Sequence, residues 1–123
     1  MSDLTSKNKS LMHRIYQEMW NGGDPALAAE IFSRPEGVEN FVSQFLFAFP
    51  DLQHTIAAII EEGDQVAVRF SAQGTHAGQW MDIPATGRPI HYTGVTLARI
   101  KDNRIIEHYT WWDRAGLMEQ IGA

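Results

Sequence analysis

The chain has 123 residues, a formal net charge of −5, 44% hydrophobic residues and 20% charged residues. The length predicts one domain spanning residues 1–123, and the composition excludes a disordered, collagen-like or coiled-coil chain. The sequence contains no cysteine, which excludes a disulfide scaffold, thiol catalysis and cysteine-ligated metal or iron–sulfur sites. Ten Lys and Arg residues stand against fifteen Asp and Glu residues without a basic patch, so nucleic acid is not expected as a partner.

The sequence contains no candidate membrane segment. Its longest apolar runs, 45–50 and 56–60, are far shorter than the roughly 20 residues that a spanning helix needs. Residues 1–8 are polar and lack the apolar centre of a signal peptide. We therefore expect no membrane partner and a cytoplasmic location.

The first half of the chain has helical periodicity. An apolar stripe predicts a first helix over residues 6–20, and Asn21-Gly22-Gly23 ends it because glycine accepts the left-handed backbone conformation. A short helix is expected over 25–32, and a third follows Pro35 with its apolar stripe over 38–49. The stripe of the first helix consists of Leu11, Met12, Ile15, Tyr16, Met19 and Trp20.

The second half of the chain has the patterns of strands. Strands are expected over 52–61, 66–73, 90–100 and 105–112, with a hairpin turn at 101–104 and a closing helix over 114–121. Helices followed by a run of long strands predict an α+β domain, in which the helices cover one face of a curved antiparallel sheet. A hollow at the open end of such a sheet is a typical ligand site.

No local motif points to a cofactor or a metal ion. The sequence has no glycine-rich phosphate loop, no G-x-S-x-G and no H-E-x-x-H. No two histidines stand at the spacing of paired metal ligands, so each is interpreted as a surface or hydrogen-bonded core residue and no metal site is expected. The histidines are His13, His54, His76, His91 and His108.

The densest group of reactive side chains is the segment 107–113. With a period of two, Glu107, Tyr109, Trp111 and Asp113 share one face of the strand, and His108, Thr110 and Trp112 share the other. A carboxylate beside indole rings is poorly solvated, which suits a general acid or base and makes Asp113 the first catalytic candidate. Asp113 can equally be the cap of the helix that begins at Arg114.

For four other side chains, a structural role and a role at the site are both compatible with the sequence. Arg99 is a strand-surface residue or reaches a carboxylate across the hairpin. Tyr16 and Trp20 belong to the core or contact a substrate. His76 lines a pocket or holds the turn at 74–78.

Four stretches of the chain form an ordered pattern: 20–24; 49–52 with 62–69; 74–78 with 83–88; and 99–100 with Ile105, 112–117 and 120–122. In their order and spacing these stretches resemble the SnoaL-like polyketide cyclases, also known as ester cyclases. The resemblance covers the whole chain as a single SnoaL-like domain. It implies the nuclear-transport-factor-like cone, also called a cystatin-like α+β barrel, in which a curved antiparallel sheet wraps around the N-terminal helices.

The resemblance also implies chemistry. Family members close a ring of an aromatic polyketide ester by an intramolecular aldol reaction, with a pocket carboxylate as acid and base and without a cofactor or metal. The corresponding aspartate here is Asp113. One departure is that Phe32 passes through Ser33-Arg34-Pro35 directly into the third helix, where relatives carry an additional segment. We therefore expect a shallower or more open pocket.

These observations predict a cofactor-independent enzyme for a small hydrophobic or aromatic carbonyl substrate. Asp113 would take a proton next to a carbonyl, and Arg99, His91 or Tyr16 would donate a hydrogen bond to the resulting enolate. Tyr16, Trp20, His76 and Trp111 would bind the substrate, with Trp111 as a flat wall.

Two other functions are compatible with the same residues. An epoxide hydrolase or isomerase would need Arg99 and Asp113 to face the same cavity at hydrogen-bonding distance. A non-catalytic small-molecule binding protein would have a pocket lined by Trp and Phe, with Asp113 capping its helix. In each case we expect a homodimer or a dimer-based oligomer, because the strand over 90–100 has apolar side chains on both faces and helices cover only one.

Overall fold

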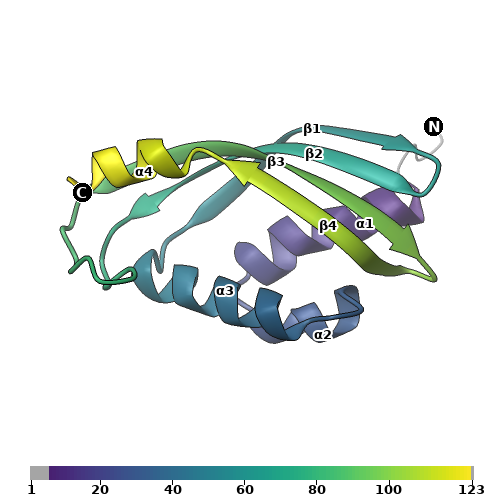
Figure 1. The fold of residues 1–123 in the computed structure, drawn as a ribbon, viewed down its shortest axis with the longest axis horizontal. Coiled ribbons are helices and arrows are strands. Elements are labelled where there is room, and N and C mark those ends of the chain that lie inside the picture. The colour runs from purple at the N-terminus through teal and green to yellow at the C-terminus, as the bar shows by residue number, and fades with distance from the viewer. Residues whose placement is uncertain (1–5, 123) are drawn as a thin grey trace.

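The computed structural model describes residues 6–122, which form two layers (Figure 1). One layer is an antiparallel sheet of four strands in the order β1-β2-β3-β4. The strands are β1 (Gln53–Glu62), β2 (Gln65–Thr75), β3 (Pro89–Lys101) and β4 (Arg104–Trp112). Each strand overlaps the segment expected for it, and the α+β class is confirmed.

The other layer consists of helices that cover one face of the sheet (Figure 1). Helix α1 (Lys7–Arg14) continues without a break as the π-helix η1 (Ile15–Trp20). The 3₁₀-helix η2 (Pro25–Leu27) leads into α2 (Ala28–Ile31), and α3 (Glu36–Ala48) follows. Helix α4 (Arg114–Gln120) lies beyond the end of β4. Within residues 6–122, no helix is both long enough and apolar enough to span a membrane.

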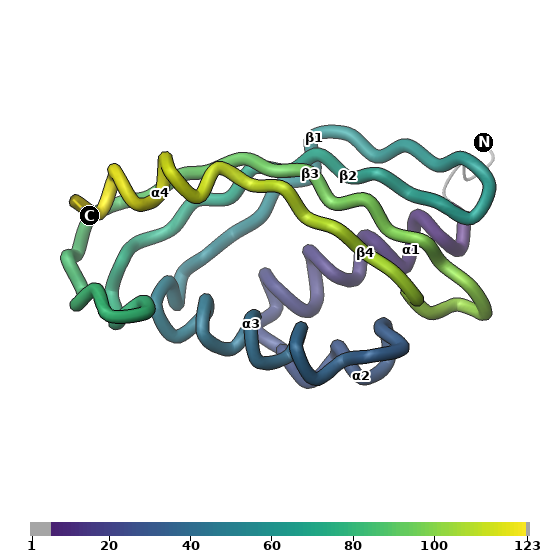
Figure 2. Tube along the Cα trace, viewed as in Figure 1, coloured from purple at the N-terminus to yellow at the C-terminus, as the bar shows by residue number. Residues whose placement is uncertain are grey.

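The sheet is curved, and Figure 2 shows its strands arching over the helices. Two register shifts contribute to this shape, one in β1 between Ile56 and Ala58 and one in the β3–β4 pair between Arg99 and Ile100. A bulge adds a residue to one strand only, so that strand bends and its local twist increases. The curvature gives the sheet a concave face toward α1, η1 and α3.

The concave face carries the core. Side chains alternate along β2 and β3, so that one set is buried and the other faces outward. Gly94 of β3 lies between Phe70 of β2 and Trp112 of β4 in one cross-strand row. A Cβ atom at Gly94 would lie 2.7 Å from the Phe70 ring and 2.9 Å from the Trp112 Cβ, so only glycine permits this close approach.

The convex face of the sheet carries an exposed apolar patch, formed by Ile60, Val95, Tyr109 and Trp111. Val95 pairs with Trp111 across β3 and β4, and the rings of Tyr109 and Trp111 stack with centroids 6.1 Å apart. Tyr109 and Trp111 are 51% and 59% exposed, which is unusual for side chains of this size. Exposed patches of this kind are typical of an association surface.

We expect this patch to join two copies of the chain, so that the protein sediments at about twice the 13.9 kDa of one chain. Replacing both Tyr109 and Trp111 with Glu should give monomers, because two facing carboxylates would repel each other across a symmetric interface. Phe47→Glu is the matched control, since Phe47 is 68% exposed on α3 and lies outside the patch. A wild-type mass of one chain at micromolar concentration would contradict the expectation.

Candidate functional site

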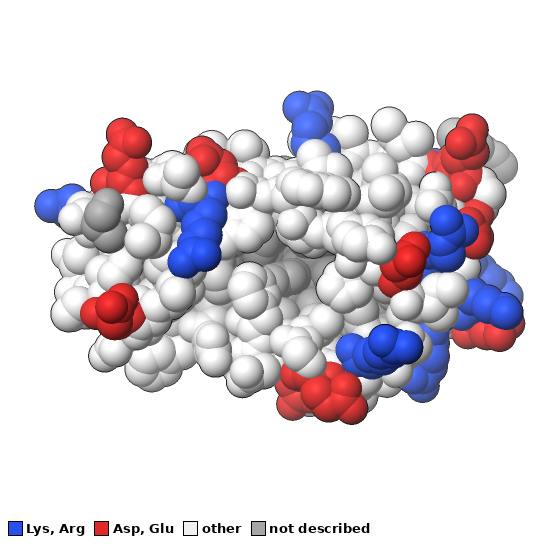
Figure 3. Space-filling view, viewed as in Figure 1, with Lys and Arg blue, Asp and Glu red and all other residues white. Residues whose placement is uncertain are grey.

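A cavity of about 510 Å³ lies between the concave face of the sheet and the helices η1 and α3. Figure 3 shows a hollow near the middle of the molecule, between β4 and α3 as Figure 1 places them. Aromatic and aliphatic side chains make up most of the lining, including Met19, Trp20, Phe32, Val38, Phe41, Val42, Phe45, Phe70, Tyr92 and Trp112. A cavity of this size and character fits a small organic molecule.

The π-helix η1 forms the inner wall of the cavity. The backbone N–H of Asn21 donates to the Tyr16 carbonyl oxygen at 2.9 Å, the i to i−5 bond of a wider helical turn. This segment brings Ile15, Tyr16, Met19 and Trp20 to the cavity lining. The sequence predicts a helix here, but it does not predict the change from α to π geometry.

The side chain of Asn21 fixes the edge strand β1 to the end of this helix. Its Nδ2 donates to the backbone carbonyl of His54 at 2.9 Å, and its Oδ1 accepts from the backbone N–H of His54 at 2.7 Å. The two bonds satisfy both backbone groups of His54, as a neighbouring strand would. Asn21 thereby sets the position of His54 relative to η1.

The imidazole of His54 lies among aromatic rings. The nearest ring centroids are those of Trp20 at 4.8 Å, Phe70 at 5.4 Å and Tyr16 at 5.5 Å. His54 is 7% exposed, lines the cavity, and its buried Nδ1 has no hydrogen-bond partner among the described residues. Burial disfavours the charged form and lowers the pKa of His54 to about 4, so the ring is neutral at pH 7.

Three hydroxyl groups form a chain across the cavity wall. The Tyr16 hydroxyl donates to Thr96 Oγ1 at 2.7 Å, and Thr96 Oγ1 lies 2.9 Å from Thr110 Oγ1. Burial raises the pKa of Tyr16 to about 12, so its hydroxyl keeps its proton. Because Thr96 accepts from Tyr16, its own proton is available to Thr110, and the Thr110 proton can point into the cavity.

The mouth of the cavity lies along β4, where His108 and Thr110 are exposed. Desolvation on the side of the ring that packs edge-on against Phe32, at a centroid distance of 5.0 Å, lowers the pKa of His108. Phe32 pairs with Ile105 of β4 in an isolated bridge, and Ser33 N–H donates to the Ile105 carbonyl at 2.9 Å. The short link between α2 and α3 is thus held against β4, and the cavity stays open beside it.

The cavity contains two of the side chains expected to bind substrate, Tyr16 and Trp20. The prediction that Trp111 lines the pocket is wrong. The alternation along β4 is as predicted, but Trp111 lies on the convex face and Trp112 on the concave face. His76 is fully buried away from this cavity, packs against Phe49 and has its Nδ1 3.0 Å from Thr86 Oγ1.

The candidate base Asp113 does not line the cavity. It is exposed, and its Oδ1 accepts from the backbone N–H of Gly116 at 2.9 Å, which makes it the N-cap of α4. His91 also lies outside the cavity, where its backbone N–H and carbonyl each bond to the Gln120 side chain at 2.7 Å.

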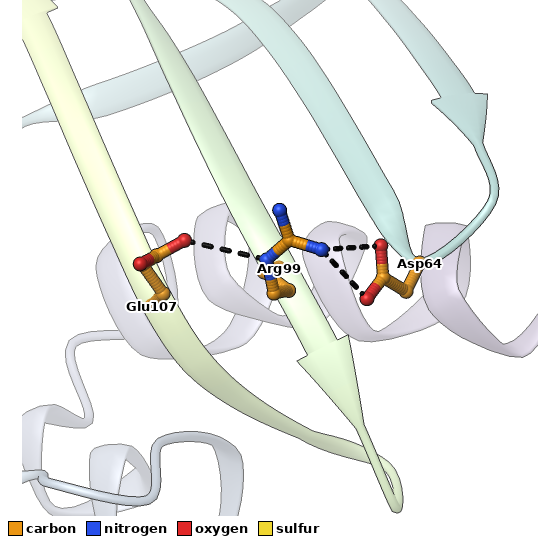
Figure 4. Close-up of polar contacts among 3 residues, drawn as sticks. All are labelled: Asp64, Arg99 and Glu107. Carbon is orange, nitrogen blue, oxygen red and sulfur yellow. Dashed lines mark hydrogen bonds and ion pairs between the residues drawn. The ribbon is translucent and has the colours of Figure 1, made fainter.

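Arg99 lies in an ion-pair network rather than in the cavity. Figure 4 shows its guanidinium between Asp64 and Glu107, with Nη1 2.9 Å from both Asp64 oxygens and Nε 3.3 Å from Glu107 Oε1. These carboxylates raise the pKa of Arg99 further. Arg99 and Asp113 therefore do not form the pair that the epoxide-opening alternative requires.

The structure brings together residues that the sequence interpretation did not select, namely Asn21, His54, Thr96, His108 and Thr110. No three His, Asp or Glu side chains gather as a possible metal site within residues 6–122. In the sequence, His54 is isolated near the start of an expected strand and belongs to no motif. The period of β4 groups His108, Thr110 and Trp112 on one face, but it does not show that this face is the one toward the cavity.

Comparisons with known proteins agree with this fold. A family model described as SnoaL-like polyketide cyclase matches residues 10–121. The aklanonic acid methyl ester cyclase DnrD of Streptomyces peucetius is 30% identical over 119 residues, which cover 96% of this chain and 81% of that protein. The structure of AclR from Streptomyces galilaeus superposes with a TM-score of 0.88 at 25% identity, over 96% of this chain and 82% of AclR. The structure of IdmH from Streptomyces antibioticus superposes with a TM-score of 0.79 at 28% identity, over 96% of this chain and 100% of IdmH.

We expect the burial of His54 to make the fold less stable in acid. Its pKa is about 4 in the fold against an ordinary 6.5, so between pH 7 and 5 the unfolded chain takes up a proton that the folded chain does not. Unfolding free energy should therefore fall by about 2 kcal/mol over this range on account of His54 alone. Urea denaturation of wild type and His54→Gln at both pH values measures this, with His91→Gln as control. An equal pH dependence in wild type and His54→Gln would contradict it.

Proposed function

Because the chain belongs to the family of SnoaL-like polyketide cyclases and is therefore an enzyme of the cyclase or isomerase type, we propose that it moves a proton next to a carbonyl group of an aromatic, polyketide-like substrate. The reaction takes place in the cavity between the sheet and α3. The observation that carries the proposal is a neutral, unpartnered imidazole, His54, in an aromatic cavity that also contains a chain of hydroxyl donors.

His54 is the proposed base. No Asp or Glu is among the described residues of the lining, and burial keeps His54 unprotonated at neutral pH. A base with a pKa of about 4 removes only protons that are already acidic, such as those on a carbon between two carbonyls. Poly-β-carbonyl chains contain such carbons, which supports a polyketide-like substrate and an aldol-type ring closure.

The hydroxyl chain is the proposed partner for the negative charge that forms on the carbonyl oxygen. Loss of the proton from carbon turns the carbonyl into an enolate, whose oxygen needs a hydrogen-bond donor. Thr110 lies at the cavity mouth with Thr96 and Tyr16 behind it, and each hydroxyl polarises the next. The aromatic walls hold a flat ring system.

The non-catalytic alternative shares part of this geometry, since Trp and Phe line the cavity and Asp113 caps α4. The family and the polar groups at the cavity wall favour an enzyme. Asp113 has no part in the proposed mechanism, because its carboxylate is bonded at the start of α4 outside the cavity.

The proposal is tested by proton exchange on an aryl β-keto ester such as ethyl benzoylacetate. We expect the protein to accelerate deuterium incorporation at the central carbon, followed by NMR in deuterated buffer. His54→Gln should reduce the enzymatic rate by about 10²-fold or more, because it removes the base. Thr110→Val should reduce it by about tenfold or more, because it removes the proposed donor.

Two matched variants separate the possibilities. Asp113→Asn keeps a capping oxygen and should leave the rate unchanged, and His108→Gln tests the second imidazole of the lining. If Asp113→Asn loses the rate and His54→Gln keeps it, Asp113 is the base and the proposal is wrong. Ligand binding without any acceleration over buffer would favour the binding protein.

A further inference from the structure

The cavity lining contains one side chain with a permanent charge among the residues that the structure describes, Arg34. The rest of this lining is apolar or carries hydroxyl or imidazole groups. Its two histidines, His54 and His108, have lowered pKa values and give no fixed positive charge at neutral pH. The Arg34 guanidinium is therefore the one fixed charge among the described residues of this lining.

No carboxylate of the described residues lies within 4 Å of the Arg34 guanidinium, whereas Arg14 and Arg99 each lie within that distance of two. Among the arginines without such a partner, Arg34 is the one that lines the cavity. A cation at a cavity wall without an internal partner is available to a ligand. Its planar fork of donors matches a carboxylate in two parallel hydrogen bonds.

The backbone that carries Arg34 is fixed at the cavity mouth. On one side Ser33 N–H donates to the Ile105 carbonyl of β4 at 2.9 Å, and on the other the Pro35 carbonyl accepts from Glu39 N–H of α3 at 2.9 Å. Gly37 lies beside Arg34 in the lining, and a Cβ atom there would meet nothing within 4 Å. There is therefore open space for a ligand group at Gly37, on the part of the lining that Arg34 shares.

We infer that the substrate carries an ionised carboxylate, which Arg34 binds at the cavity mouth while the aromatic body lies against the inner walls. This inference rests on the proposed function and specifies its substrate class as a free aromatic acid rather than its ester. It separates this chain from DnrD, whose name states a methyl ester as its substrate. A neutral ester offers Arg34 a carbonyl acceptor, but neither the opposite charge nor the two equivalent oxygens of a carboxylate.

The test compares two probes that differ only in charge, anthraquinone-2-carboxylate and its methyl ester. Binding is measured by quenching of tryptophan fluorescence, because Trp20 and Trp112 line the cavity. We expect the wild type to bind the acid about tenfold more tightly than the ester, as a charge-assisted hydrogen-bond pair allows. Roughly 0.5 M salt should weaken the binding of the acid and leave the binding of the ester unchanged, because salt screens the ion pair.

Arg34→Gln should bind both probes with the affinity that the wild type has for the ester, and Arg34→Lys should keep part of the preference for the acid. Arg69→Gln is the matched control, since Arg69 is exposed on β2, outside the cavity lining, and its loss should change neither affinity. Equal binding of acid and ester by the wild type, or an unchanged preference in Arg34→Gln, overturns the carboxylate inference and leaves the proposed function standing. Failure of the wild type to bind either probe counts against both.

Discussion

The pair of hydrogen bonds between the Asn21 side chain and the His54 backbone connects the helical layer to the edge of the sheet. It replaces the strand neighbour that β1 lacks on that side and holds His54 against Tyr16 and Trp20 of η1. Tyr16 and Trp20 both reach the cavity from this one short segment. The position of the edge strand beside the site therefore depends on one amide side chain at the end of a helix.

A consequence of this arrangement is a base that is weak but always available. Burial among aromatic rings lowers the pKa of His54 to about 4, and its Nδ1 has no hydrogen-bond partner among the described residues. An unsatisfied buried polar atom typically costs about 1–3 kcal/mol, which a fold retains more readily where the group has a function. The same aromatic surroundings that weaken the base would hold a flat substrate beside it, with Thr110 at the open mouth as the hydrogen-bond donor.

Hydrophobic period predicted the helices, the strands and the two faces of β4, because burial on one face imposes that period. It does not predict which face is concave, since this depends on the sheet's curvature and bulges, and it is Trp112 rather than Trp111 that lies inside. The tryptophan neighbours of Asp113 in sequence predict a poorly solvated carboxylate, yet the chain turns there and the carboxylate caps α4. No sequence pattern marks His54 as a site residue, because its aromatic neighbours come from η1, β2 and β3 and meet only in the fold.

The central claim is that chemistry takes place in the cavity beside His54. A crystal structure with an aromatic β-dicarbonyl ligand tests it most directly. The account predicts a ring between β4 and α3, a carbonyl oxygen within hydrogen-bonding distance of Thr110 Oγ1, and the carbon between the carbonyls facing the His54 imidazole. A ligand bound beside Asp113 and α4, with the cavity empty, would contradict it.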